Sequence, residues 1–143
     1  METGNHSRSP IVVAIAEAEQ KTSGQISVHL SRRWIDRDPL KSANQIFVRY
    51  RLHQTEQRNA VLLYFNLRRK KFAICGDVGI HQRVGNEYWQ GVARELKSEL
   101  QGTHYERAIA NSIRKIGTVM AKFFPREGLQ KKVNELPDDV TED

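Results

Sequence analysis

The chain has 143 residues, a single cysteine and a formal net charge of +6. A chain of this length suits one domain, which buries enough surface on folding to need neither a disulfide nor a metal ion for its core. Hydrophobic residues make up 38% and charged residues 28% of the sequence, which excludes a membrane protein and disfavours a disordered one. Because it contains no run of about 18 apolar residues and no signal segment, we expect a cytoplasmic protein without membrane insertion.

The positive charge is concentrated in the first half of the chain. Residues 1–71 contain 13 Lys and Arg against 6 Asp and Glu, whereas residues 72–143 contain 10 against 11. The densest part is the run from Arg68 to Lys71. Such an excess favours an anionic partner, nucleic acid included. An ordinary solvated surface is the alternative interpretation.

Four segments of the sequence have the patterns of helices. Ser9 and Asp38 each precede a proline, and a polar cap followed by proline is typical of a helix start. The first of these two helices ends before the segment 22–24. Apolar residues at helical spacing predict two further helices, over about 86–100 and 105–123.

Three segments between these helices have the patterns of strands. Residues 25–30 alternate polar and apolar side chains, as a half-buried strand does. The continuous apolar run 60–65 is typical of a central strand that is covered on both faces. Residues 71–75 follow a tight basic turn, so we expect them to pair with 60–65 as a hairpin.

The order α-β-α-β-β-α-α predicts an α/β fold, a three-layer α/β/α sandwich with a small mixed sheet. The first two strands are joined by a helix and are expected to run parallel, and the hairpin adds an antiparallel strand. This topology places residues 55–59 and 76–77 at one end of the sheet. The basic turn lies at the other end, about 17 Å away for strands of five residues. Residues 1–8 are predicted to be flexible, and 126–143 to form a disordered polar tail.

Asp77 is the strongest candidate for a functional residue. It lies between two glycines after the third strand, and the predicted topology brings it near Glu56, Asn59 and Glu87. One interpretation is a metal ligand or a carboxylate that handles a phosphoryl group, which also makes Asp77 the best candidate for a catalytic residue. The alternative is a turn cap whose neighbouring glycines supply the backbone angles. Glu87 has an alternative role beside the positive end of a helix dipole.

Anion-binding residues are expected at both ends of the sheet. Arg58 and Asn59 are candidates for holding a phosphate, with an ion pair between Arg58 and Asp77 as the alternative. The hairpin turn offers a second group, Arg68, Arg69, Lys70 and Lys71. Trp34 is a candidate for an exposed aromatic residue at a partner surface. Phosphate-loop, nucleophile-elbow and dinucleotide-binding motifs do not occur, so no organic cofactor is predicted.

Five short segments of the sequence share the pattern of a known family. They are Thr22–Ile26, His53–Tyr64, Phe72–Ile80, Val84–Trp89 and Phe123–Pro125. Together they resemble the TPM domain family over about residues 11–125, which implies an α/β/α domain spanning residues 9–125. The resemblance also implies binding of a divalent cation, Ca²⁺ or Mg²⁺, by residues such as Asp77, Glu56 and Glu87. Acid phosphatase activity is implied by plant members of the family.

This chain departs from the family pattern at two positions that bear on cation binding. The family commonly has Glu where this chain has Gln25, and acidic residues in the turn that is basic here. Hard cations need several oxygen ligands, mostly carboxylates. The sequence therefore favours a small binding or accessory module that acts through a protein partner over a metal-assisted phosphatase. Nucleic-acid or other anion binding is a third alternative, although aromatic and basic residues are not interleaved on one element.

Overall fold

The computed structural model describes residues 9–126 and 139–143, which divide into two compact units. The sheet unit comprises the described residues of 24–83 and 139–143, and the helical unit those of 9–23 and 84–126. The predicted flexible segment 1–8 and most of the predicted tail lie outside the described residues. Four helices and a mixed four-stranded sheet are described, which are the elements of the predicted α/β/α sandwich.

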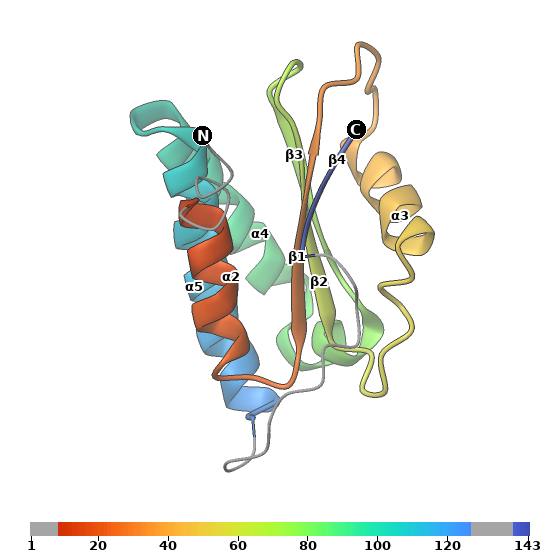
Figure 1. Cartoon of the computed structure of the whole chain (residues 1–143), viewed down its shortest axis with the longest axis vertical. Coiled ribbons are helices and arrows are strands. Elements are labelled where there is room, and N and C mark those ends of the chain that lie inside the picture. The colour runs from red at the N-terminus through yellow and green to blue at the C-terminus, as the bar shows by residue number, and fades with distance from the viewer. Residues whose placement is uncertain (1–8, 127–138) are drawn as a thin grey trace, which may run out of the picture. The chain divides into compact units, whose positions relative to one another are not determined.

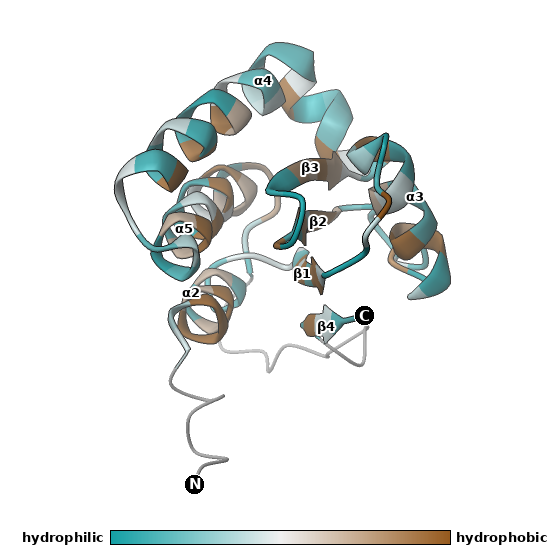
Figure 2. Ribbon diagram, turned by 90° about the horizontal axis from the view of Figure 1, so that it is seen from above, coloured by the Kyte–Doolittle hydropathy of each residue, from teal (hydrophilic) through white to brown (hydrophobic). Residues whose placement is uncertain are grey.

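The strands of the sheet, labelled in Figure 1, have the order β3-β2-β1-β4, which Figure 2 shows from above. Strands β1 (Gln25–Ser31) and β2 (Ala60–Asn66) run parallel and are joined through helix α3 (Pro39–Arg49). Strand β3 (Lys71–Gly76) pairs antiparallel with β2. The parallel pair and the hairpin are both as predicted. On the other side of β1 lies β4 (Val140–Glu142), which runs parallel to it.

Strand β4 shows that the prediction of a disordered tail over residues 126–143 is wrong for its last residues. The Val28 N–H donates to the Asp139 carbonyl at 2.8 Å, and the Asp143 N–H donates to the Leu30 carbonyl at 3.1 Å. A strand of three residues has too few positions to show a periodic pattern. Its partners on β1 lie more than 100 residues earlier in the chain, so no local signal identifies it.

Both faces of β1 are buried, which the prediction of a half-buried strand did not anticipate. Apolar side chains line one face. The other face carries only polar side chains, those of Gln25, Ser27, His29 and Ser31. Next to this polar face, α3 packs on β2 and β3, and Figure 2 shows hydrophobic residues along these strands. The apolar core of the sheet unit includes Ile46, Phe47, Leu62 and Tyr64.

The helical unit contains α2 (Pro10–Glu19), α5 (Tyr105–Phe123) and most of α4 (Val78–Gly102). Helices α2 and α5 pack closely, since a Cβ atom on Gly117 would lie 2.6 Å from the Cβ of Ala18. Helix α5 has its predicted bounds. Helix α4 begins eight residues earlier than predicted and is interrupted at Gly85, where φ is 79° and ψ is 172°. None of the helices in the described ranges is long and apolar enough to cross a membrane.

Candidate functional site

The Asp77 carboxylate is held in a bidentate ion pair with Arg58. Arg58 Nε lies 2.7 Å from Asp77 Oδ2, and Nη2 lies 2.8 Å from Oδ1. The Val78 N–H also donates to Oδ1, so Asp77 caps the start of α4. The Asp77 side chain is 5% exposed, and its hydrogen bond to Arg58 and its charge raise the pKa of Arg58. The ion pair that the sequence left as an alternative is therefore the arrangement present.

The loop before β2 is pressed against the first turn of α4. A Cβ atom on Gly79 would lie 2.1 Å from the Gln57 carbonyl oxygen and 2.6 Å from that of Arg58. This close approach lets the Gly79 N–H donate to the Arg58 carbonyl at 2.8 Å. Arg58 itself has a φ of 52°, which non-glycine residues adopt only when their surroundings hold them there. Glycine at position 79 is thus needed for contact between the two backbones.

The predicted cation ligands do not form a cluster. Glu56 is exposed on the loop before β2, and Glu87 is exposed on the part of α4 that belongs to the helical unit. Asn59 is buried, and its Nδ2 donates to Gln57 Oε1. No group of three or more His, Cys, Asp or Glu side chains within residues 9–126 and 139–143 is placed to hold a metal ion. A cation site formed by Asp77, Glu56 and Glu87 stays a prediction.

The opposite edge of the sheet brings together the carboxyl ends of its three parallel strands. In open α/β sheets, ligands bind outside the carboxyl ends of parallel strands. Here β1 is followed by the loop 32–38 and β2 by the hairpin turn 67–70. The basic turn and Trp34 both lie at this edge, and the position of the turn is the predicted one. Buried polar groups at this edge position its exposed side chains.

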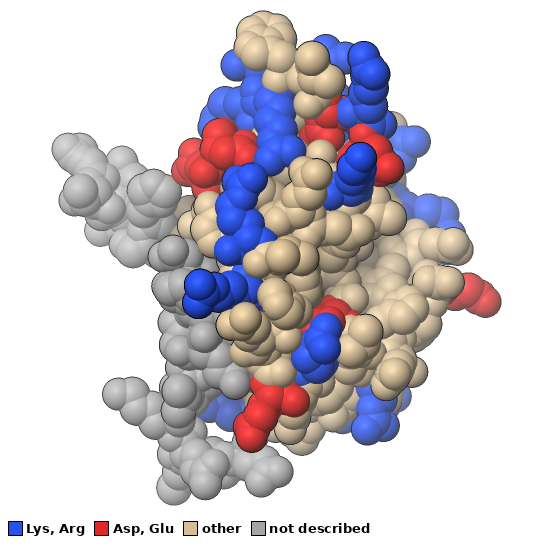
Figure 3. Space-filling model, turned by 90° about the vertical axis from the view of Figure 1, so that its right-hand side faces the viewer, with Lys and Arg blue, Asp and Glu red and all other residues tan. Residues whose placement is uncertain are grey.

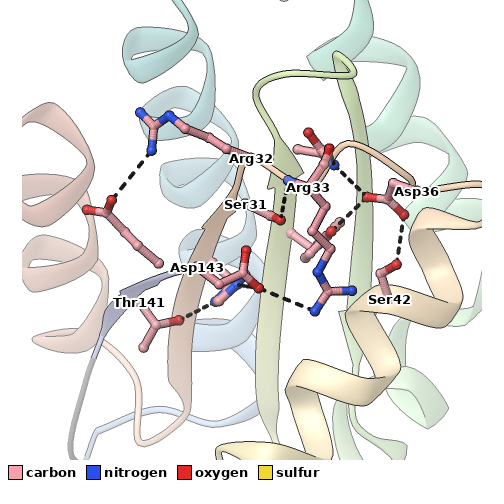
Figure 4. Close-up of polar contacts among 11 residues, drawn as sticks. Ser31, Arg32, Arg33, Asp36, Ser42, Thr141 and Asp143 are labelled. Carbon is pink, nitrogen blue, oxygen red and sulfur yellow. Dashed lines mark hydrogen bonds and ion pairs between the residues drawn. The ribbon is translucent and has the colours of Figure 1, made fainter.

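Asp36 is a buried carboxylate at this edge, and Figure 4 shows its contact with Ser42. Its Oδ1 accepts from Ser42 Oγ at 2.7 Å, and its Oδ2 accepts from the Tyr64 hydroxyl at 2.7 Å and from Asn66 Nδ2 at 3.0 Å. Burial raises the pKa of Asp36, but these three hydrogen bonds and the charge of Arg33 outweigh it and hold the pKa below its usual value. Sequence reasoning missed Asp36, because an acid in a loop rich in Arg has the pattern of a solvated residue.

Backbone carbonyls of the loop 32–38 are bound by side chains from β2 and the hairpin. Asn66 Nδ2 donates to the Arg33 carbonyl, and Lys71 Nζ donates to the Asp36 carbonyl at 2.9 Å. Arg68 Nε donates to the Arg32 carbonyl at 2.8 Å. These contacts tie the loop to the neighbouring strands at three points.

The loop nevertheless exposes two large apolar side chains. Trp34 is 71% and Ile35 is 73% exposed, so the predicted exposure of Trp34 is confirmed. The guanidinium carbon of Arg68 lies 3.8 Å from the centroid of the Trp34 ring, within range of a cation–π contact. The loop therefore presents an aromatic and an aliphatic side chain from a backbone that is held in place.

The four basic residues of the hairpin turn divide into two pairs. Arg68 and Lys71 bind carbonyls of the loop 32–38, as described above. The side chains of Arg69 and Lys70 are exposed and have no partner among the residues that the structure describes. Figure 3 shows basic side chains at this end of the molecule with acidic ones among them. In the predicted anion-binding turn, Arg68 and Lys71 thus hold the loop 32–38 in place. Of the four residues, only Arg69 and Lys70 have side chains without a partner in the described part of the chain.

His29 forms a second buried polar group near the same edge. It is fully buried, its Nδ1 lies 2.7 Å from Thr141 Oγ1, and its Nε2 lies 3.0 Å from Asp143 Oδ2. Arg33 Nη2 lies 3.3 Å from the same oxygen of Asp143. Burial raises the pKa of Asp143, but hydrogen bonds from Ser31 and His29 and the charge of Arg33 hold it below its usual value. Sequence reasoning missed this group because it depends on β4.

Comparisons with known proteins agree with the fold described above. A family model described as TPM domain matches residues 5–119. Among solved structures, the chain is similar to the NMR structure of the BA42 protein from the psychrophilic bacterium Bizionia argentinensis, with 28% sequence identity and a TM-score of 0.84. The match covers 99% of this chain and 94% of that one. No curated protein matches. Because the family model covers most of the sequence, the chain belongs to the TPM domain family.

Proposed function

We propose that the chain is a binding or accessory module that acts through a partner protein at the carboxyl edge of its sheet. The contact area, called here the Trp34 surface, consists of Trp34, Ile35, Arg68, Arg69 and Lys70. One observation carries the proposal. The two most exposed large apolar side chains of the described residues are adjacent, on a loop that a buried carboxylate and three carbonyl contacts hold in place.

The rigidity of this loop favours binding. A single exposed apolar side chain needs no explanation, but adjacent exposed side chains can contribute to a binding patch. A loop that is already ordered loses little conformational entropy when a partner binds, so more of the contact energy appears as affinity. Trp and Arg are also enriched among the residues that dominate the energy of interfaces. Arg69 and Lys70 supply unpaired positive charge beside the apolar pair, which favours a partner with acidic groups around an apolar pocket.

A protein partner fits this surface better than a nucleic acid. Single-stranded nucleic acids bind to platforms of several aromatic rings. Trp34 is the only exposed Phe, Tyr or Trp in the described part of the chain, and Arg68 already covers its ring. Acidic side chains, including Asp38 and Glu142, lie at the same edge and would repel phosphates. Nucleic-acid binding is therefore the weaker proposal.

Cation binding and phosphatase activity have less support from the residues present. Ca²⁺ and Mg²⁺ prefer several carboxylate oxygens. Both oxygens of Asp77 already accept hydrogen bonds from Arg58, and the position at which the resembled family commonly has Glu is a neutral amide, Gln25, in this chain. These residues do not fit a hard cation.

The experiment compares variants of the Trp34 surface with a matched control. Proteins captured from a cell extract by the full chain are identified and purified, and their affinities are measured by calorimetry. Trp34→Ala is expected to weaken binding about tenfold or more, as truncation of an interface anchor does. Val48→Ala, which shortens a side chain that is 62% exposed on α3, is the control and is expected to leave the affinity unchanged. Equal binding by the Trp34→Ala and wild-type chains contradicts the proposal.

A further inference from the structure

The segment Asp139–Asp143, called here the tail segment, occupies the edge of β1 beyond the strand pair β1–β2. Its three strand residues pair with Val28, His29 and Leu30. Backbone hydrogen bonds at both ends close this short ladder, from Val28 to Asp139 and from Asp143 to Leu30. The tail segment thus binds β1 as an added strand, a mode of recognition in which the main chain supplies affinity and alternate side chains supply specificity.

Alternate side chains of the tail segment face two different surroundings. Thr141 and Asp143, both labelled in Figure 4, contact the same imidazole: His29 Nδ1 lies near Thr141 Oγ1 and His29 Nε2 near Asp143 Oδ2. Arg33 contacts the same carboxylate oxygen of Asp143. On the outer side, Arg32 Nη1 lies 3.6 Å from Glu142 Oε1. β1 and the residues after it thus contact a hydroxyl group at position 141 and carboxylates at positions 142 and 143 of the tail segment.

The attachment of the tail segment depends on polar contacts more than on apolar burial. Its only apolar side chain is that of Val140, which is half-buried. Three basic or imidazole side chains face two carboxylates across the junction, so the charges are complementary. Every one of these contacts can be made in the same way by the tail segment of another molecule, which is the condition for exchange of an element between protomers.

We propose that this site on β1 accepts the tail segment of a second copy of the chain, so that two molecules associate by exchanging β4. In the exchanged dimer the edge of each β1 is paired, as it is in the single chain, so neither form leaves a row of backbone groups without partners. The intramolecular form is expected to dominate in dilute solution, and association is expected to grow with concentration by mass action. The proposal concerns the edge of β1 and is independent of the Trp34 surface.

A peptide binding measurement tests the site with the full chain. The probe is a fluorescent peptide of residues 138–143, blocked at both ends, and the matched control peptide carries Val and Asn in place of Thr141 and Asp143. The double variant T141V/D143N weakens the chain's own tail segment and is expected to bind the probe about tenfold more tightly than the wild-type chain does. The control peptide is expected to bind this variant about tenfold less tightly than the probe does.

The receptor side of the site is tested with Arg33→Ala, added to the double variant. Because Arg33 contacts Asp143 directly and its side chain is only 28% exposed, its removal is expected to lower probe affinity severalfold. Circular dichroism shows whether each variant folds. If T141V/D143N does not fold, the single variant Asp143→Asn is used in its place. Absence of probe binding to a folded variant with a weakened tail segment overturns the proposal, and so does equal binding of the control peptide.

Self-association tests the choice of a second copy as the occupant. Sedimentation of the wild-type chain is expected to show a dimer that increases with concentration, and T141V/D143N is expected to show less of it. Arg69→Glu/Lys70→Glu serves as the control and is expected to dimerise like the wild type, because neither side chain contacts the tail segment in the described residues. A wild-type chain that stays monomeric up to about 1 mM, the range of weak specific association, overturns the exchange.

Discussion

Replacing Asp36 with alanine removes the acceptor that three buried donors share. The Tyr64 hydroxyl, the Asn66 amide and the Ser42 hydroxyl all lose a partner at once. Tyr64 and Asn66 are almost fully buried, so water cannot easily replace the carboxylate. The loop 32–38 also loses the side chain that attaches it to β2 and α3.

The cost follows from the energy of buried polar groups that lack partners. Each such group costs about 1–3 kcal/mol, and hydrogen bonds to a charged group lie at the upper end. Relaxation of the loop and entry of water reduce the sum, so we expect Asp36→Ala to lower the free energy of unfolding by about 3–5 kcal/mol. Asp36→Asn is expected to cost less. Its amide oxygen can accept from Tyr64 and Asn66 while its nitrogen donates to Ser42 Oγ.

Urea unfolding at neutral pH, followed by circular dichroism, measures these differences. Asp38→Ala is the matched control, because Asp38 is an exposed acid in the same loop whose one described role is to cap α3. Loss of such a cap costs about 1 kcal/mol. The reasoning is refuted if Asp36→Ala destabilises the chain no more than Asp38→Ala does, or if Asp36→Asn is as damaging as Asp36→Ala.

Three further predictions follow from single features of the structure. Arg69→Glu/Lys70→Glu is expected to change the free energy of unfolding by under about 0.5 kcal/mol. Lys71→Ala loses the hydrogen bond to the Asp36 carbonyl and is expected to change this free energy more, as urea unfolding of the two variants would show. Gly85→Ala is expected to cost about 1–3 kcal/mol, because Gly85 has a backbone conformation that is essentially restricted to glycine, and Gly102→Ala, which meets no atom within 4 Å, is the control in the same assay. The contacts of Asp143 stabilise β4 when its carboxyl is ionised, and its pKa is lower in the folded chain. Their contribution is therefore complete above about pH 4 and is lost as the pH falls through the lower folded value. Amide NMR signals of residues 139–143 are expected to shift in that acidic range and to shift less in Asp143→Asn; equal shifts in the two chains contradict this assignment.

Local signals in the sequence predicted most of the helices and the central hairpin. Ser9 and Asp38 accept hydrogen bonds from Ile11 and Lys41, so the predicted caps are present. Such signals depend on neighbouring residues and can be recognised without the fold. The start of α4 was missed because the glycines beside Asp77 have the pattern of a loop. In the structure, Gly79 instead lets the first turn of α4 lie against the loop before β2.

The candidate sites were predicted less completely because they depend on contacts between distant residues. Arg58 and Asp77 were both singled out, but the sequence does not tell whether two nearby charges bind a ligand or one another. Asp36 takes its partners from residues 28 and 30 positions later, and their approach depends on the pairing of β1 with β2. The charged neighbours of Trp34, by contrast, were enough to predict its exposure.

The two unlike faces of β1 have a consequence for strand alignment. In a parallel sheet whose strands are apolar on both faces, sliding one strand by a residue costs little in hydrophobic burial. In β1, the same slip would turn His29 toward the apolar side and Val28 toward Asp143, because side chains alternate between faces. An unpaired imidazole and an unpaired carboxylate would then be buried, at a cost of several kcal/mol. The polar side chains of β1 thus favour a single register of this strand with β2 and β4.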